Sequence, residues 1–142
     1  MKKILFILTL MIGLMSCSGG GENTANAKSP AKDRVEILYF HGKQRCKTCM
    51  AIEQNTREVI EKTFANEVKN GTVVFRIIDI STPQGETTAD KYEVTWSSLF
   101  VNKWKNGRET RNNMTEFGFG SAKNNPEAFK QGLTDKIRQS LE

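Results

Sequence analysis

The chain is poor in the residues from which metal sites and disulfide scaffolds are built. Its 142 residues include one histidine and three cysteines. A closed zinc site needs four ligands and would have to use all three cysteines and the one histidine, so it is not expected here. Three cysteines are also too few for a disulfide-dense scaffold. With 37% hydrophobic and 26% charged residues, the composition is that of a globular protein and excludes collagen-like and disordered classes.

A long hydrophobic run and a concentrated block of charge are also missing. The apolar run over residues 4–15 contains about a dozen residues, whereas a transmembrane helix needs about 20. The formal charge of +5 is spread along the chain, so no nucleic-acid partner is predicted. No internal repeat is found. The length therefore predicts one ordinary domain.

The first residues have the pattern of a targeting signal. Lys2 and Lys3 precede the short apolar run, and small residues follow it, which is typical of a secretory signal peptide. The run ends in Leu14-Met15-Ser16-Cys17, which resembles the lipobox of bacterial lipoproteins. That resemblance implies a signal peptide over residues 1–16 and acylation of Cys17, with enough acyl chains for stable anchoring. The alternative is an ordinary signal peptide with an incidental cysteine.

A tether is predicted between the anchor and the domain. Residues 18–31 contain no large apolar side chain, so residues 17–32 are expected to form a lipid-anchored flexible tether. No acidic run follows Cys17. We therefore expect the domain over residues 33–142 to lie in the bacterial cell envelope, held at the membrane and facing the periplasm. Its two thiols, Cys46 and Cys49, then lie where disulfides persist.

The domain begins with a pattern of strand, helix and strand. Residues 35–40 are almost all apolar, which predicts a strand buried on both faces. After a loop over 41–45, the period of residues 46–68 predicts an amphipathic helix, stopped by Asn70-Gly71. Its predicted buried stripe consists of Cys49, Ile52, Thr56, Val59, Ile60, Thr63 and Phe64.

The second half adds a hairpin and a last helix. The predicted elements are a strand over 72–80, a loop over 81–85, a short helix over 86–92, a strand over 98–101, and an edge strand over 108–114 after the turn Lys105-Asn106-Gly107. Asn125-Pro126-Glu127 begins the last helix, with an apolar face of Phe129, Leu133, Ile137 and Leu141. This order predicts an α/β fold, a mixed sheet with helices on both faces.

The motif Cys46-Lys47-Thr48-Cys49 lies between the first strand and the first helix. A disulfide across it closes a loop too small to add much stability, which favours a chemical role for the pair. Unpaired N–H groups and the helix dipole stabilise a thiolate on Cys46, and Lys43, Arg45 and Lys47 add positive charge. Cys46 is then the exposed attacking thiol and Cys49, one turn further, the resolving thiol.

At these residues the sequence resembles the thioredoxin-like family, over nearly all of 33–142. The matching pieces are the strand before the cysteine motif, the strand ending at Asp79, the segment 89–94, the hairpin turn and the last helix. The resemblance implies a thioredoxin-like three-layer α/β/α fold with a mixed four-stranded central sheet. It also implies a thiol–disulfide oxidoreductase with the redox pair Cys46 and Cys49, no cofactor, and a monomeric state. Its partners would be protein or small-molecule thiols and disulfides of the envelope.

Two positions depart from the family pattern. The family has a proline before its third strand, whereas Thr95-Trp96-Ser97-Ser98 occupies that region here. Trp96 or Ser97 therefore takes the place of the proline at the substrate rim, and the groove is expected to be altered. Arg45 replaces the aromatic residue usually found before the first cysteine, which makes the rim basic. Thr48 and His41 complete the expected thiol environment, and Glu36 is the candidate buried acid.

Two other functions fit the same residues. Cys46 and Cys49, together with His41 or Met50, are a possible soft-metal set for an ion such as Cu(I). Alternatively, the domain is a non-catalytic binding module with an inert disulfide, in which Trp96 and Trp104 contact a partner. The more usual role for such tryptophans is partly buried packing. Residues 117–120 are expected to form a loop that packs its aromatic rings onto the last helix.

Overall fold

A mixed four-stranded sheet runs through the middle of the molecule. The structure is a computed structural model that describes residues 32–142. The predicted signal peptide, Cys17 and the tether up to residue 31 lie outside this part of the chain. The strands are β1 (Arg34–His41), β2 (Val73–Asp79), β3 (Ser98–Lys105) and β4 (Arg108–Thr110), in the order β2-β1-β3-β4. β1 and β2 are parallel, and the other pairs are antiparallel, so the predicted mixed sheet is confirmed.

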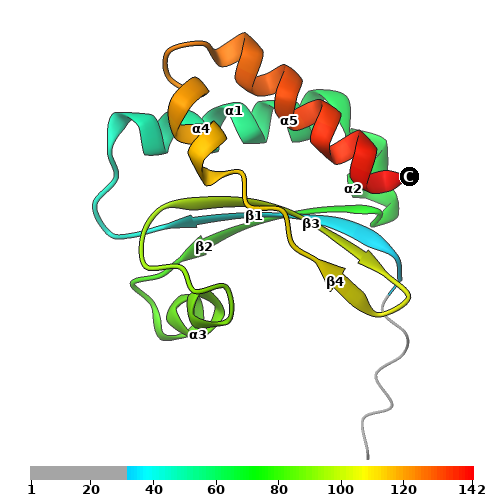
Figure 1. The fold of residues 1–142 in the computed structure, drawn as a ribbon, viewed down its shortest axis with the longest axis horizontal. Coiled ribbons are helices and arrows are strands. Elements are labelled where there is room, and N and C mark those ends of the chain that lie inside the picture. Colours follow the sequence, from blue (N-terminus) through cyan, green and yellow to red (C-terminus); the bar gives the residue numbers. More distant parts are fainter. Residues whose placement is uncertain (1–31) are drawn as a thin grey trace, which may run out of the picture.

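Helices cover both faces of this sheet. One face carries α1 (Lys47–Thr63), α2 (Ala65–Asn70), α4 (Thr115–Ser121) and α5 (Pro126–Leu141), and the other carries α3 (Pro83–Lys91) (Figure 1). The predicted three-layer α/β/α architecture is therefore confirmed. No helix in residues 32–142 is long and apolar enough to cross a membrane.

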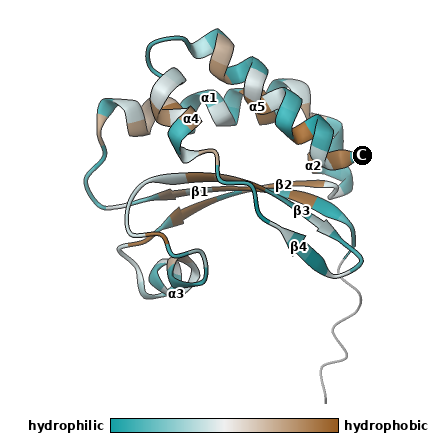
Figure 2. Cartoon of the chain, viewed as in Figure 1, coloured by the Kyte–Doolittle hydropathy of each residue, from teal (hydrophilic) through white to brown (hydrophobic). Residues whose placement is uncertain are grey.

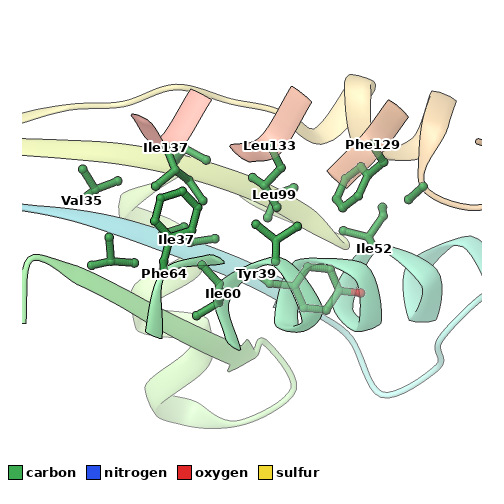
Figure 3. Packing of buried hydrophobic residues seen from close by; sticks show 14 residues of the cluster. Val35, Ile37, Tyr39, Ile52, Ile60, Phe64, Leu99, Phe129, Leu133 and Ile137 are labelled. Carbon is green, nitrogen blue, oxygen red and sulfur yellow. The ribbon is translucent and has the colours of Figure 1, made fainter. Parts of the chain in front are cut away.

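The continuous apolar character of β1 follows from its central place. Ile37 and Tyr39 point to the layer of α1 and α5, where they pack in one large core (Figure 3). Leu38 and Phe40 alternate with them and pack in a second, smaller core against α3. In the hydropathy view, β4 is the hydrophilic edge of the sheet, as its polar sequence predicts (Figure 2).

The helix predicted over 46–68 is two helices rather than one. Phe64 leaves the helical conformation (φ −119°, ψ 23°) while its ring stays buried in the large core. Its N–H still donates to the carbonyl of Ile60. Thr63, predicted on the buried stripe, is exposed, because the chain turns at the next residue. Gly71, with φ 80°, ends α2 as predicted.

Two boundaries on the α3 side differ from the prediction. α3 begins at Pro83 instead of 86, because the Thr82 hydroxyl caps it by accepting from the Gly85 N–H at 3.1 Å. The loop predicted over 81–85 is accordingly shorter. The third strand continues past Val101 to Lys105, and it runs directly into the predicted turn, where Asn106 and Gly107 both have positive φ.

The C-terminal third contains an unexpected helix. Residues 117–120, predicted as a loop, belong to α4, while β4 ends at Thr110 instead of continuing to 114. Phe117 stacks on Phe129 of α5 with ring centroids 5.8 Å apart. This contact agrees with the prediction that the aromatic rings of residues 117–120 pack onto the last helix. α5 begins at Pro126 as predicted, but Leu141 at its end is 38% exposed instead of buried.

Candidate functional site

The two cysteines lie where α1 begins, just beyond the carboxyl end of β1. Cys46 is the N-cap residue of α1 and Cys49 lies in its first turn, and a disulfide joins them. Cys46 is exposed, whereas Cys49 is only 6% exposed. An incoming sulfur therefore reaches Cys46 first, and Cys49 is shielded behind it.

The start of α1 favours negative charge on the Cys46 sulfur. The backbone N–H of Cys49 donates to Cys46 Sγ at 3.0 Å, so the sulfur occupies the position of a helix cap. No acidic side chain lies in the first turn to oppose the positive end of the helix dipole. A thiolate formed at Cys46 would thus gain both a hydrogen bond and a favourable field.

A buried tyrosine fixes this turn to the sheet. The hydroxyl of Tyr39 donates to the backbone carbonyl of Cys49 at 2.7 Å. Tyr39 is fully buried, and burial raises the pKa of its phenol. No sequence motif marks this role of Tyr39. The available signal was its position on the β1 face that meets α1.

The basic rim is smaller than the sequence predicts. Arg45 forms an ion pair with Glu53 of α1, and its guanidinium also lies over the Tyr39 ring, 5.9 Å from the centroid. Glu53 also pairs with Arg57 at 3.2 Å, so its carboxylate offsets only part of the Arg45 charge. Lys43 and Lys47 are exposed, and they provide the positive charge on the surface beside Cys46.

An open cleft of about 390 Å³ borders the disulfide. Trp96 and Ser97, the residues predicted to replace the proline, both line it. Trp96 is 60% exposed and forms an outer wall, while Ser97 is buried. The other lining residues are Gly42, Gln44, Cys46, Cys49, Ile80, Thr95 and Phe119. Residues 32–142 contain no cis peptide bond.

Phe119 is a wall of the cleft that sequence reasoning did not find. Its ring stacks on Trp96, with centroids 5.1 Å apart and an interplanar angle of 23°. It belongs to α4, a helix that the sequence did not predict, and no local pattern links it to Trp96. The pair forms a continuous aromatic surface beside the cysteines.

Other predicted residues lie near the site without lining the cleft. His41 ends β1, and its Nδ1 lies 3.0 Å from the Gly42 carbonyl oxygen. Lys47 and Thr48 lie between the two cysteines in sequence. Lys47 is exposed and Thr48 is half-buried.

Glu36, the candidate buried acid, lies at the opposite end of β1 from the cysteines. It is buried, but its carboxylate pairs with Arg34 at 2.7 Å and accepts from Trp104 Nε1 at 3.1 Å. It is therefore part of a structural cluster and is not within reach of the thiols. Trp104 is partly buried in the same cluster, with the Arg34 guanidinium 4.9 Å from its ring centroid.

The side chains of the soft-metal alternative are Cys46 and Cys49 with His41 or Met50. No group of three His, Cys, Asp or Glu side chains in residues 32–142 is placed to hold an ion. Cys46 and Cys49 are bonded to each other, and the Met50 side chain is exposed on α1.

A polar network supports the segment that carries Trp96 and Ser97. The Tyr92 hydroxyl donates to the Glu109 carboxylate, which also accepts from the fully buried Asn102 at 3.0 Å. Burial, followed by the hydrogen bond and charge of Glu109, raises the pKa of Tyr92 to about 12. Arg111 lies over the Tyr92 ring, 4.1 Å from the centroid, and donates to the Lys91 carbonyl at 2.6 Å. These contacts fix the end of α3 and the start of the segment over 92–97.

No family model matches the sequence, and no curated protein matches it either. Among solved structures, a thioredoxin from Thermus thermophilus matches with 18% identity and a TM-score of 0.43, over 72% of this chain and 76% of that one. Thioredoxin-2, described as a component of malaria parasite protein secretion machinery, matches with 17% identity and a TM-score of 0.49, over 76% and 84%. The strand order, the two helical layers and the Cys46–Cys49 disulfide at the start of α1 agree with the three-layer α/β/α fold and the mixed four-stranded sheet that the sequence predicts.

Proposed function

We propose that this chain is a thiol–disulfide oxidoreductase that exchanges disulfides through Cys46 and Cys49. One observation carries the proposal. An exposed sulfur caps a helix, is bonded to a buried sulfur one turn further on, and opens onto a cleft. The bond closes too small a loop to stabilise the fold much, so a structural role does not account for the pair. A structural disulfide also does not need one exposed and one buried sulfur.

From the oxidised state, exchange begins at Cys46. A partner thiolate attacks Cys46 Sγ, the Cys46–Cys49 bond breaks, and Cys49 leaves as a thiolate. A second thiolate of the partner then attacks the partner sulfur bonded to Cys46. The partner gains a disulfide, and this chain is left with two reduced cysteines, so two electrons have moved from the partner to the pair.

From the reduced state, the same steps run in reverse. The Cys46 thiolate, stabilised by the Cys49 N–H, attacks a partner disulfide and releases one partner thiolate. Cys49, deprotonated, then attacks Cys46 Sγ in the mixed disulfide and releases the second partner thiolate. Reduction, oxidation and isomerisation use this one geometry, and the reduction potential of the pair decides between them.

We further propose that the domain works from a lipid anchor, facing the periplasm of a bacterial envelope. The support is in the sequence: the short apolar run over 4–15, the Leu14-Met15-Ser16-Cys17 ending and the tether over 17–32. The proposal predicts that the full chain incorporates a labelled fatty acid and sediments with membranes. A Cys17→Ala chain that still did both would contradict it.

The exchange function is tested by the redox equilibrium of the pair. A soluble chain of residues 18–142 is equilibrated in thiol/disulfide buffers of graded potential, then alkylated and weighed by mass spectrometry. We expect one two-electron midpoint, at which the ratio of the forms changes tenfold per about 30 mV. The Cys46→Ser/Cys49→Ser chain is the control for alkylation elsewhere.

Other results of this experiment would favour other functions. A disulfide that resists both reduction and re-oxidation across the series would indicate an inert binding module. Thiols protected from alkylation only when copper is added would indicate metal handling. Either result would overturn the exchange proposal.

A further inference from the structure

A second groove lies on the other side of the Trp96–Phe119 wall. Its volume is about 800 Å³, and Trp96 and Phe119 line both this groove and the cleft at the cysteines. It is formed by the segment leading into β3, by the start of β3 and by α4, and the stacked rings of Trp96 and Phe119 join the first of these to the last. A polypeptide docked at Cys46 can therefore continue into it without leaving the surface.

The groove has aromatic walls and acidic side chains. Tyr92, Phe100, Trp96 and Phe119 supply four aromatic rings, and Glu93 and Glu116 supply two carboxylates. No lysine or arginine is among the lining residues, but Arg111 covers one face of the Tyr92 ring and Phe100 is buried, so Trp96 and Phe119 are the rings most open to a partner. Aromatic rings contact the apolar stem of a lysine or arginine, and they attract its cation through the ring quadrupole.

Both carboxylates are available to a partner. Glu93 and Glu116 are exposed, and within residues 32–142 neither side chain forms an ion pair or a hydrogen bond. Glu93 also has a φ of 55°, a conformation in which glycine or asparagine is less strained. Glu93 therefore holds its exposed carboxylate at a position where the backbone conformation is unfavourable for a glutamate.

The charge on the other side of the wall is opposite. Lys43 and Lys47 are exposed beside Cys46, so a basic residue of a docked segment is repelled there and attracted to the groove. This gradient sets the direction in which a segment lies across the Trp96–Phe119 pair. The groove and the cleft share the Trp96–Phe119 wall, so an extended segment reaches the groove within a few residues of the reacting cysteine.

We propose that this groove binds a lysine or arginine side chain of the polypeptide whose cysteine exchanges with Cys46. The inference rests on the proposed exchange function and adds a substrate class to it: protein segments with a basic residue a few positions from the cysteine. Small disulfides, which do not reach the groove, are then exchanged without this selection.

The test compares peptides that differ at one position. Each peptide carries one cysteine, blocked as a mixed disulfide with a small aromatic thiol that is coloured when released, and either Arg, Gln or Glu three residues away. Attack of Cys46 on the peptide sulfur releases the coloured thiolate, and Cys49 then displaces the peptide thiolate to give the oxidised chain. The symmetric disulfide of the aromatic thiol is the small-molecule substrate.

We expect the reduced chain to react with the Arg peptide about tenfold to 30-fold faster than with the Glu peptide, which lies within the range that two exposed ion pairs and one cation–π contact supply together. In the Glu93→Gln/Glu116→Gln chain the preference should fall to about twofold to fivefold, which the cation–π contact supplies alone, with the rate on the small disulfide unchanged. The Glu61→Gln/Glu67→Gln chain loses the same charge from α1 and α2, where Glu61 is exposed and Glu67 is half-buried, and it should keep the preference.

The possible failures are distinguishable. If the reduced wild-type chain does not react with the small disulfide, the exchange function itself has failed. If it does react, three results overturn the groove assignment: equal rates for the three peptides, a preference of unchanged size in Glu93→Gln/Glu116→Gln, or an equal loss of preference in Glu61→Gln/Glu67→Gln.

Discussion

Replacing Cys49 with serine is expected to leave Cys46 covalently bound to partner proteins in cells. Cys49 is the sulfur that resolves the mixed disulfide, and no other thiol lies in residues 32–142. An intramolecular thiol reacts at an effective concentration far above that of a free thiol, so the lifetime of the adduct should increase by at least about 100-fold. The measurement is a non-reducing gel of the full-length chain after acid quenching, in which higher bands disappear on reduction.

The matched control is Cys46→Ser. Cys49 is buried under the first turn of α1 and 6% exposed, so as the remaining thiol it should give few or no adducts. This asymmetry between the two single variants follows from the difference in exposure. Adducts of equal yield in both variants would contradict the assignment of roles, and no adducts in either would count against exchange with proteins.

Phe129→Ala is expected to cause the largest loss of stability. Phe129 is fully buried on α5, its ring stacks on Phe117 of α4, and it packs in the same core as Ile52 of α1. Truncating a buried phenylalanine costs about 3–5 kcal/mol in the free energy of unfolding, because a cavity remains. Domains of this kind have a total of about 5–15 kcal/mol, so a large part of the stability is lost.

Denaturant unfolding of the oxidised domain measures this loss, with Leu141→Ala as the control on the same helix. Leu141 is 38% exposed at the end of α5, and its truncation should change the free energy of unfolding by less than about 1 kcal/mol. The packing of α4 and α5 would have to be reconsidered if the two variants lost stability equally.

The elements that could be predicted from sequence are those with strong local chemistry. The apolar run of β1, the turn at Asn106-Gly107 and the helix start at Asn125-Pro126 each act within a few residues, and each is confirmed. α4 could not be predicted, because Gly118 and Gly120 disfavour a helix locally. A Cβ added at Gly118 would lie 3.3 Å from Ile52 Cδ1, so the glycine permits the close packing that stabilises α4.

The parts of the site that could be predicted are those that a local sequence feature marks. Cys46, Cys49 and the segment with Trp96 and Ser97 could be found because a motif and a missing proline mark them. Phe119 joins them through a tertiary contact that leaves no periodic signal. Glu36 was wrongly predicted to lie near the cysteines. It is on the first strand, but it lies at the end of that strand away from them, and its being an acid on this strand did not indicate which end it occupies.

The hydrogen bond from Tyr39 to the Cys49 carbonyl has a consequence for the entropy of docking. It joins the cysteine turn to the central strand through a side chain that is fully buried, so the turn cannot swing toward a partner without breaking a buried contact. The site is preorganised, and it loses little conformational freedom when a mixed disulfide forms. The partner must supply the movement, and segments that are already flexible or unfolded can bring a sulfur into line with Cys46 at the lowest cost.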